Sequence, residues 1–123
     1  MKIGQAIKEI RIRKKIPQEY FAKVICEVSP VTLRAIESGS RDPSRKIVDA
    51  IQRNLGIPYS YILLYSLTED DVDIEKIPMV NATKEALMES IGKPYVLPEE
   101  YLKKKRRKLY VQTEKMISSK VQL

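Results

Sequence analysis

The side chains that most often carry catalytic chemistry are scarce in this chain. Its 123 residues include no histidine and one cysteine, Cys26. That composition excludes Ser-His and Cys-His nucleophile pairs and removes the commonest zinc ligand. The acidic stretch 69–75 is the one cluster of carboxylates, and it lacks the loop spacing and the glycine of a calcium site. We therefore predict a protein that is not an enzyme and that binds no metal or cofactor.

The charged residues form two basic blocks on either side of an acidic one. Residues 1–66 hold 12 Lys/Arg and 6 Asp/Glu, residues 67–91 hold 2 and 7, and residues 92–123 hold 9 and 3. Basic blocks bind polyanions because they release condensed counterions. Nucleic acid is therefore the first partner that we expect, and an anionic membrane surface is the second.

The sequence also bears on the compartment. No apolar run approaches the length of about 18 residues that a membrane span requires. The first residues have charges threaded through their apolar positions, which is not the pattern of a signal peptide. A single cysteine forms no intramolecular disulfide, as expected in a reducing compartment. We expect a cytoplasmic protein with no membrane segment.

Apolar periodicity predicts five helices in the first half of the chain. Proline, serine and glycine mark their starts and ends. The helices are expected from Ile3 to before Pro17, from Gln18 through Ile25, from Ser29-Pro30 to Ser38, across Ile47 to Leu55, and from Pro58 to Tyr65. Residues 1–66 are therefore predicted to form one all-α domain.

The second half of the chain is patterned more weakly. Residues 67–80 are acidic, have no apolar stripe and are predicted to be a linker. Residues 81–123 are predicted to form a helical tail for dimerisation or partner binding, with Asn81 capping one helix and Pro98 opening another.

The helix after Pro98 has two features of note. Leu102, Leu109 and Met116 repeat every seven residues, and the run from Lys103 to Lys108 surrounds the helix with charge. This basic run has two interpretations. It is either a second element that binds a nucleic-acid backbone, or a solvated stretch of a helix whose apolar stripe packs on a twin subunit.

The segment from Ser29 to Ser38 is the strongest candidate for base recognition. An α-helix turns about 100° per residue, so Leu33 and Ile36 define the side of this helix that faces the core. The residues on or beside the opposite face are Val31, Thr32, Arg34, Ala35 and Ser38. Arg34 is the one side chain among them that is able to make a bidentate contact with guanine, whereas Val31 and Ala35 offer apolar contact to thymine methyl groups.

The second and third predicted helices are short and are joined by a tight turn, and Ser29 caps the start of the third. This arrangement is a helix-turn-helix pattern. Here the sequence resembles the phage repressor/Cro type of helix-turn-helix domain, the family often called XRE-like. The matching pieces lie in order between Ile3 and Leu64: Ile7-(x2)-Ile10-Arg11, Gln18-Glu19-(x)-Phe21-Ala22, Leu33-(x2)-Ile36-Glu37-(x)-Gly39, Arg41-(x)-Pro43-Ser44 and Leu55-Gly56-Ile57. The resemblance implies an all-α, five-helix repressor-like domain, here followed by an acidic linker and a helical tail.

The resemblance also implies roles for individual residues. Gln18 matches the residue whose side chain and helix N-terminus meet a DNA phosphate. Ala22 matches the small residue at the crossing of the second and third helices, and Arg11 and Glu37 match a structural ion pair. The loop from Ser38 to Arg45, which contains Ser44, matches a segment along the DNA backbone in which Arg41 and Arg45 contact phosphates.

The turn departs from the family pattern. Between Ala22 and Glu37 the chain has one residue more than usual, within Cys26-Glu27-Val28, and Cys26 stands where glycine is common. This insertion predicts a changed crossing angle of the two helices. Cys26 is interpreted as a partly buried structural thiol or, alternatively, as a redox sensor.

Two functional hypotheses follow. The first is a regulator of transcription, a repressor, that binds double-stranded DNA as a homodimer, because one reading helix contacts too few base pairs to be selective. The alternative is an antitoxin or anti-regulator whose tail wraps a protein partner and whose helix-turn-helix serves autoregulation.

Overall fold

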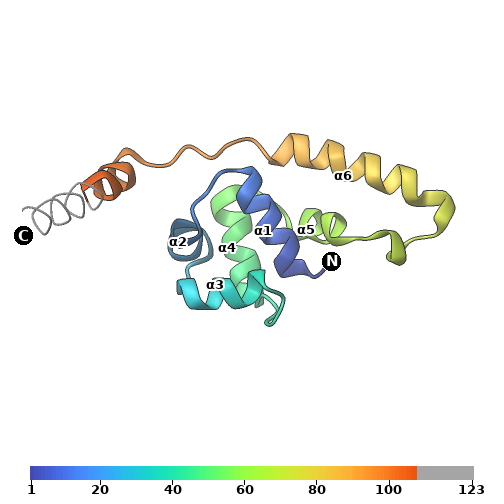
Figure 1. The fold of residues 1–123 in the computed structure, drawn as a ribbon, viewed down its shortest axis with the longest axis horizontal. Coiled ribbons are helices and arrows are strands. Elements are labelled where there is room, and N and C mark those ends of the chain that lie inside the picture. Colours follow the sequence, from blue (N-terminus) through green and yellow to red (C-terminus); the bar gives the residue numbers. More distant parts are fainter. Residues whose placement is uncertain (108–123) are drawn as a thin grey trace, which may run out of the picture.

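The computed structural model describes residues 1–107, and all regular structure in this range is helical. The prediction of an all-α fold is confirmed. Helices α1 to α5 are gathered around one core, and α6 lies alongside α1 and α5 (Figure 1). No helix among the described residues is long and apolar enough to cross a membrane. Lys108, Leu109 and Met116, which belong to the predicted basic run and apolar stripe, lie outside the described residues.

The first three helical segments are α1 (Ile3–Arg13), α2 (Gln18–Tyr20) and α3 (Pro30–Glu37). Helix α2 runs without a break into a π-helix, η1 (Phe21–Cys26). Their apolar positions form a core in which the side chains of Ala6, Ile7, Ile10, Phe21, Ala22, Ile25, Leu33 and Ile36 are almost fully buried. The predicted periodicity thus places these elements around one core.

The next two helices close the domain. Helix α4 (Arg45–Leu55) begins at its N-cap Ser44, whose Oγ accepts the backbone N–H of Ile47, and ends at Gly56 with φ of 69°. Helix α5 (Tyr59–Ser66) follows a short connection and buries Ile62 completely. The stop at Gly56 follows from the ease with which glycine adopts a left-handed backbone conformation.

The residues that follow α5 form more regular structure than their composition predicts. Two short 3-10 helices, η2 (Glu69–Asp71) and η3 (Ile74–Lys76), lead into α6 (Ile77–Ile91). The expectation that Asn81 caps this helix is wrong, because α6 begins four residues earlier. Its first turn contains Pro78, which is tolerated there, and no side chain caps it. Four residues of the predicted linker, 77–80, are therefore helical.

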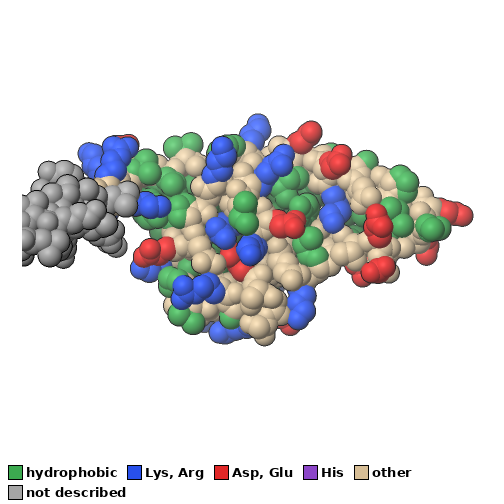
Figure 2. Space-filling model, viewed as in Figure 1, with side chains coloured by type: hydrophobic (Ala, Val, Ile, Leu, Met, Phe, Trp, Pro, Cys, Tyr) green, Lys and Arg blue, Asp and Glu red, His purple; other side chains and the backbone are tan. Residues whose placement is uncertain are grey.

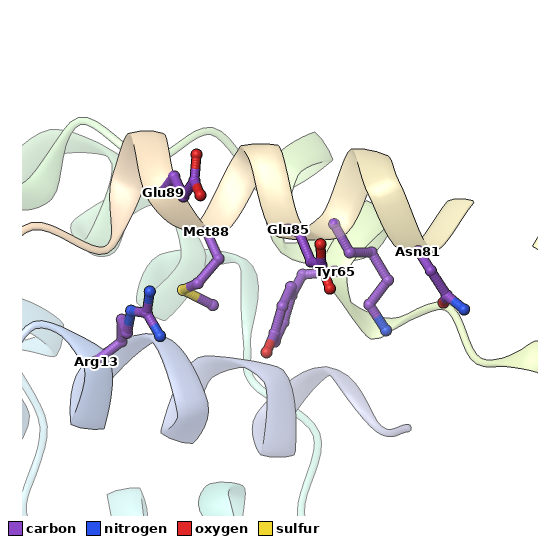
Figure 3. A pocket seen from close by; sticks show the side chains of 7 residues that line it. Arg13, Tyr65, Asn81, Glu85, Met88 and Glu89 are labelled. Atoms are coloured by element: carbon purple, nitrogen blue, oxygen red, sulfur yellow. The ribbon is translucent and has the colours of Figure 1, made fainter. Parts of the chain in front are cut away.

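Helix α6 rests on the outside of the first domain. Met88 points from α6 toward α1 beside Arg13, and Tyr65 of α5 enters the same hollow (Figure 3). The Lys84 ammonium donates to the Leu67 carbonyl at 2.6 Å and lies 5.1 Å from the centre of the Tyr65 ring. Met88 is 8% exposed, so α6 buries an apolar anchor on the domain.

The chain after α6 crosses back over the domain toward α2. The Tyr95 backbone N–H donates to the Lys14 carbonyl at 2.9 Å, and the Lys14 ammonium donates to the Lys93 carbonyl at 3.1 Å. The hydroxyl groups of Tyr20 and Tyr95 share a hydrogen bond of 3.0 Å. Residues 99–107 are again helical, and their first turn begins at Pro98. These contacts fasten the second half of the chain to the ends of α1 and α2.

Candidate nucleic-acid interface

The start of α3 is fixed by the residue that was predicted to cap it. Ser29 has an extended backbone, and its Oγ accepts the backbone N–H of Thr32 at 3.2 Å. The hydroxyl groups of the same two residues also share a hydrogen bond of 3.0 Å. Pro30 occupies the first helical position. A backbone N–H at that position would make no hydrogen bond within the helix, so proline costs nothing there. The first turn of α3 is therefore held in one geometry.

Buried and exposed residues lie on opposite faces of α3, as the helical period requires. Leu33 and Ile36 are 0% exposed, whereas Val31 is 67% exposed. Arg34 also extends into solvent, and Thr32 and Ala35 are half-buried. The structure thus brings the predicted base-reading residues together on the outer face of α3. That face offers one guanidinium, one hydroxyl and two apolar side chains for contact.

The loop between α3 and α4 folds back on the end of α3. The hydroxyls of Ser38 and Ser40 both donate to the Ala35 carbonyl, at 3.0 and 3.1 Å. Gly39 has φ of 83°, which a residue with a side chain rarely adopts. Because its hydroxyl hydrogen is engaged in this way, Ser38 offers a lone pair rather than a donor to a ligand.

The cations of this loop extend the same surface. Arg41 and Arg45 are exposed, and Ser44 lies between them at the N-cap of α4. A hollow of about 590 Å³ separates the turn before α3 from α4, and Ser29, Thr32, Arg41 and Ser44 line it. Lys46 and Arg53 of α4 line this hollow as well. Sequence reasoning missed these two residues, although the position of Lys46 directly after Arg45 was a signal for it.

The side chain of Gln18 has a structural contact within the domain. Its side-chain amide donates to Glu37 Oε1 at 2.9 Å, so this group braces α2 against α3. Pro17, the N-cap of α2, provides no side-chain hydrogen bond to the first turn. A helix start of this kind attracts anions through its backbone N–H groups.

The extra residue of the turn is accommodated by the π-helix η1. Within η1 the hydrogen bonds span one residue more than in an α-helix, and the N–H groups of both Glu27 and Val28 donate to the Ala22 carbonyl. Glu27 follows with φ of 60°, a left-handed conformation that costs about 1 kcal/mol in a residue with a side chain. Its carboxylate forms an ion pair with Arg53 of α4. The insertion thus widens the second helix, and the residue that ends it in the left-handed conformation is Glu27.

Cys26 lies inside the core, next to this turn. It is 2% exposed. Burial, and then the nearby charge of Glu37, raise the pKa of the Cys26 thiol to about 12. A thiol reacts through its thiolate, so this environment supports the structural interpretation of Cys26 rather than the redox one.

The charges on the face shown in Figure 2 are unevenly distributed. Acidic side chains gather at the end where residues 69–75 and α6 lie, whereas basic side chains lie over α3 and its following loop and on residues 99–107 (Figure 2). Among residues 1–107, no group of three Asp, Glu or Cys side chains is placed to hold a metal ion. The candidate interface is therefore a basic surface built from α3 and the loop before α4, with the start of α2 beside it.

One comparison with known proteins identifies the region of the chain that contains this surface. Residues 7–62 match a family model described as helix-turn-helix. The searches of curated proteins and of solved structures give no match. The matched range begins within α1 and ends within α5, so it includes every element of the candidate interface.

Proposed function

We propose that the protein is a repressor that binds a two-fold symmetric operator as a homodimer. The premise is that residues 7–62 belong to the Cro/C1-type, XRE-like helix-turn-helix family of DNA-binding transcription regulators. One observation carries the proposal. The exposed face of α3, the uncapped start of α2 and the cations of the loop before α4 lie on one basic surface. Such a surface suits a helix in the major groove with phosphate contacts on either side.

The composition of the α3 face defines the kind of recognition that we expect. Arg34 is the candidate for a bidentate contact with guanine, and Val31 and Ala35 are candidates for contact with thymine methyl groups. Thr32 and Ser38 supply oxygens near the groove. With so few hydrogen-bonding groups on the face, DNA shape contributes a large share of the selectivity.

The homodimer is supported by the surface of α5. Tyr59 and Leu63 lie one turn apart and are 38% and 40% exposed, although both are large apolar side chains. Tyr59 also lines a hollow with Pro43 and Arg45, beside the loop that faces the DNA. We propose this face of α5 as the dimer contact, because a palindromic operator requires two α3 helices related by a two-fold axis.

Selection of binding sites from random DNA by the full-length protein, at stated salt, tests this function. We expect an enriched palindrome whose half-sites are separated by about one helical turn. Sedimentation should show a dimer for the protein alone and two chains bound to each copy of the selected duplex. Recovery of no preferred sequence, or binding by a single chain, would contradict the proposal.

A second candidate function is an antitoxin or anti-regulator whose second half binds a protein. Ile74, Met79 and Val96 are large apolar side chains that are exposed on the surface of residues 74–96. A partner that covers them would explain their exposure. Co-expression with the product of a neighbouring small reading frame, followed by copurification through that product, distinguishes this candidate from a free-standing repressor.

A further inference from the structure

The basic helix at residues 99–107 is held in a defined place beside α2. The ring of Tyr101 packs edge-on against the ring of Tyr20, with 4.8 Å between the ring centres and 69° between their planes. Tyr95, which precedes this helix, shares a hydroxyl hydrogen bond of 3.0 Å with the same Tyr20. Tyr20 is itself 4% exposed and belongs to α2. The helix is thus anchored to α2 by an aromatic cluster formed by Tyr20, Tyr95 and Tyr101.

The anchored helix and α2 form a groove with cations along it. The groove is lined on one side by Pro17, Tyr20, Lys23 and Val24 and on the other by Tyr101, Lys104, Lys105 and Arg107. Among the described residues that line the groove, Glu19 is the one carboxylate, and it forms an ion pair with Lys23 at 2.9 Å. Lys103 to Arg107 are exposed, and they take no part in the ion pairs of Arg11 with Glu37, Lys23 with Glu19 and Arg53 with Glu27. These exposed cations are available to an external anion.

The location of the groove indicates which anion it meets. Tyr20 lies two residues after Gln18, at the helix start that faces a phosphate in the proposed complex. The acidic residues 69–75 lie at the opposite end of the molecule, where they do not oppose an approaching polyanion (Figure 2). Helix 99–107 therefore lies beside α2, close to the helix start at which we expect a phosphate.

We propose that helix 99–107 is a second phosphate-binding element, which extends the DNA footprint beyond the base pairs read by α3. Lys104, Lys105 and Arg107 neutralise backbone phosphates on the flank of the operator, and the aromatic cluster holds them at the required place. The inference rests on the proposed DNA-binding function. It assigns to the second half of the chain a direct role in affinity, independent of base sequence.

The salt dependence of binding by the full-length protein tests this role. We expect Lys104→Gln/Lys105→Gln to lower the magnitude of the slope of log K against log salt by up to about 1.8, because each neutralised phosphate contributes about 0.9. Lys76→Gln/Lys93→Gln is the matched control. It removes two exposed lysines outside the groove and should leave the slope unchanged. The loss should be the same for the selected operator and for an unrelated duplex.

Two further measurements make the test specific. Tyr101→Ala keeps every charge but removes the contact with Tyr20, and it should lower the slope by less than the double lysine variant does. Lengthening the operator duplex by one helical turn on each side should strengthen binding by the parent protein more than binding by Lys104→Gln/Lys105→Gln.

The results separate this inference from the function on which it rests. If the parent protein fails to bind DNA, the proposed function is wrong. If Arg41→Glu abolishes binding while the lysine variant and its control have equal slopes, DNA binding stands and the inference is overturned. Equal slopes are also the result expected if helix 99–107 binds an acidic protein partner instead of DNA.

Discussion

Arg11 and Glu37 join α1 to α3 through two parallel hydrogen bonds, from Nε to Oε2 at 2.7 Å and from Nη2 to Oε1 at 3.0 Å. Their side chains are 12% and 2% exposed. Arg11 also donates to the Ile16 carbonyl at 3.0 Å, and Gln18 donates to Glu37 at 2.9 Å. One buried network therefore sets the relative positions of α1, α2 and α3, and with them the geometry of the reading face.

The first prediction concerns the stability that this ion pair provides. Arg11→Met leaves a buried carboxylate without its cation, and we expect it to lower the free energy of unfolding by about 3–5 kcal/mol. Arg11→Met/Glu37→Leu removes both charges and should recover most of that loss. Urea unfolding followed by circular dichroism measures both. A loss below about 1 kcal/mol for the single variant would place the pair among weak surface ion pairs.

The second prediction separates base contacts from phosphate contacts. Arg34→Ala should reduce discrimination between the selected operator and its guanine-substituted variants by about 1–3 kcal/mol, because it removes a bidentate group. Arg41→Ala should weaken binding to every duplex alike and lower the salt slope by about 0.9. Fluorescence anisotropy with matched operators measures both. Unaltered sequence preference in Arg34→Ala would show that this side chain does not read a base.

Local signals explain why much of the first domain was predictable. The period of Leu33 and Ile36 follows from helix geometry alone, and it fixes which face of α3 is exposed. The caps Ser29 and Ser44 act on backbone groups three residues away. Such signals are contained within one turn of chain, so they can be recognised without knowing the fold.

The features that escaped prediction depend on contacts between distant residues or on weak local signals. A Cβ atom on Gly4 would lie 1.9 Å from the Ile36 carbonyl oxygen, so this glycine sets the approach of α1 to α3, and no local pattern indicates it. The contact of Tyr20 with Tyr101 joins residues far apart in sequence. The start of α6 at Ile77 has no side-chain cap. The π-helix leaves Phe21, Ala22 and Ile25 buried as an α-helix would, so periodicity does not reveal it.

The third prediction concerns the left-handed residue after this π-helix. Glu27→Gly and Glu27→Ala both remove the exposed ion pair with Arg53, but only alanine keeps the steric cost of φ near 60°. We expect the glycine variant to be more stable than the alanine variant by about 1 kcal/mol in urea unfolding. Equal stabilities would indicate that the turn relaxes to another conformation once Glu27 is replaced.

The fourth prediction uses the single thiol as a probe of the core. Burial and the charge of Glu37 raise the pKa of the Cys26 thiol to about 12, whereas the thiol pKa in an unfolded chain is 9.0. Between pH 9 and pH 12 the native state therefore keeps a proton that the unfolded state loses. The contribution of Cys26 to stability is therefore fully present below pH 9 and declines as the pH rises from 9 toward 12.

The same shift predicts how Cys26 reacts. At pH 8 a disulfide reagent should modify the native protein only through unfolding, because the thiolate is the reactive form and the native site excludes both ionisation and reagent. The rate of labelling should rise with urea in step with the unfolded fraction, and it should be higher in Arg11→Met than in the parent protein. Cys26→Ala provides the blank, since the chain has no other thiol. Rapid stoichiometric labelling of the folded protein without urea would instead support the redox interpretation of this cysteine.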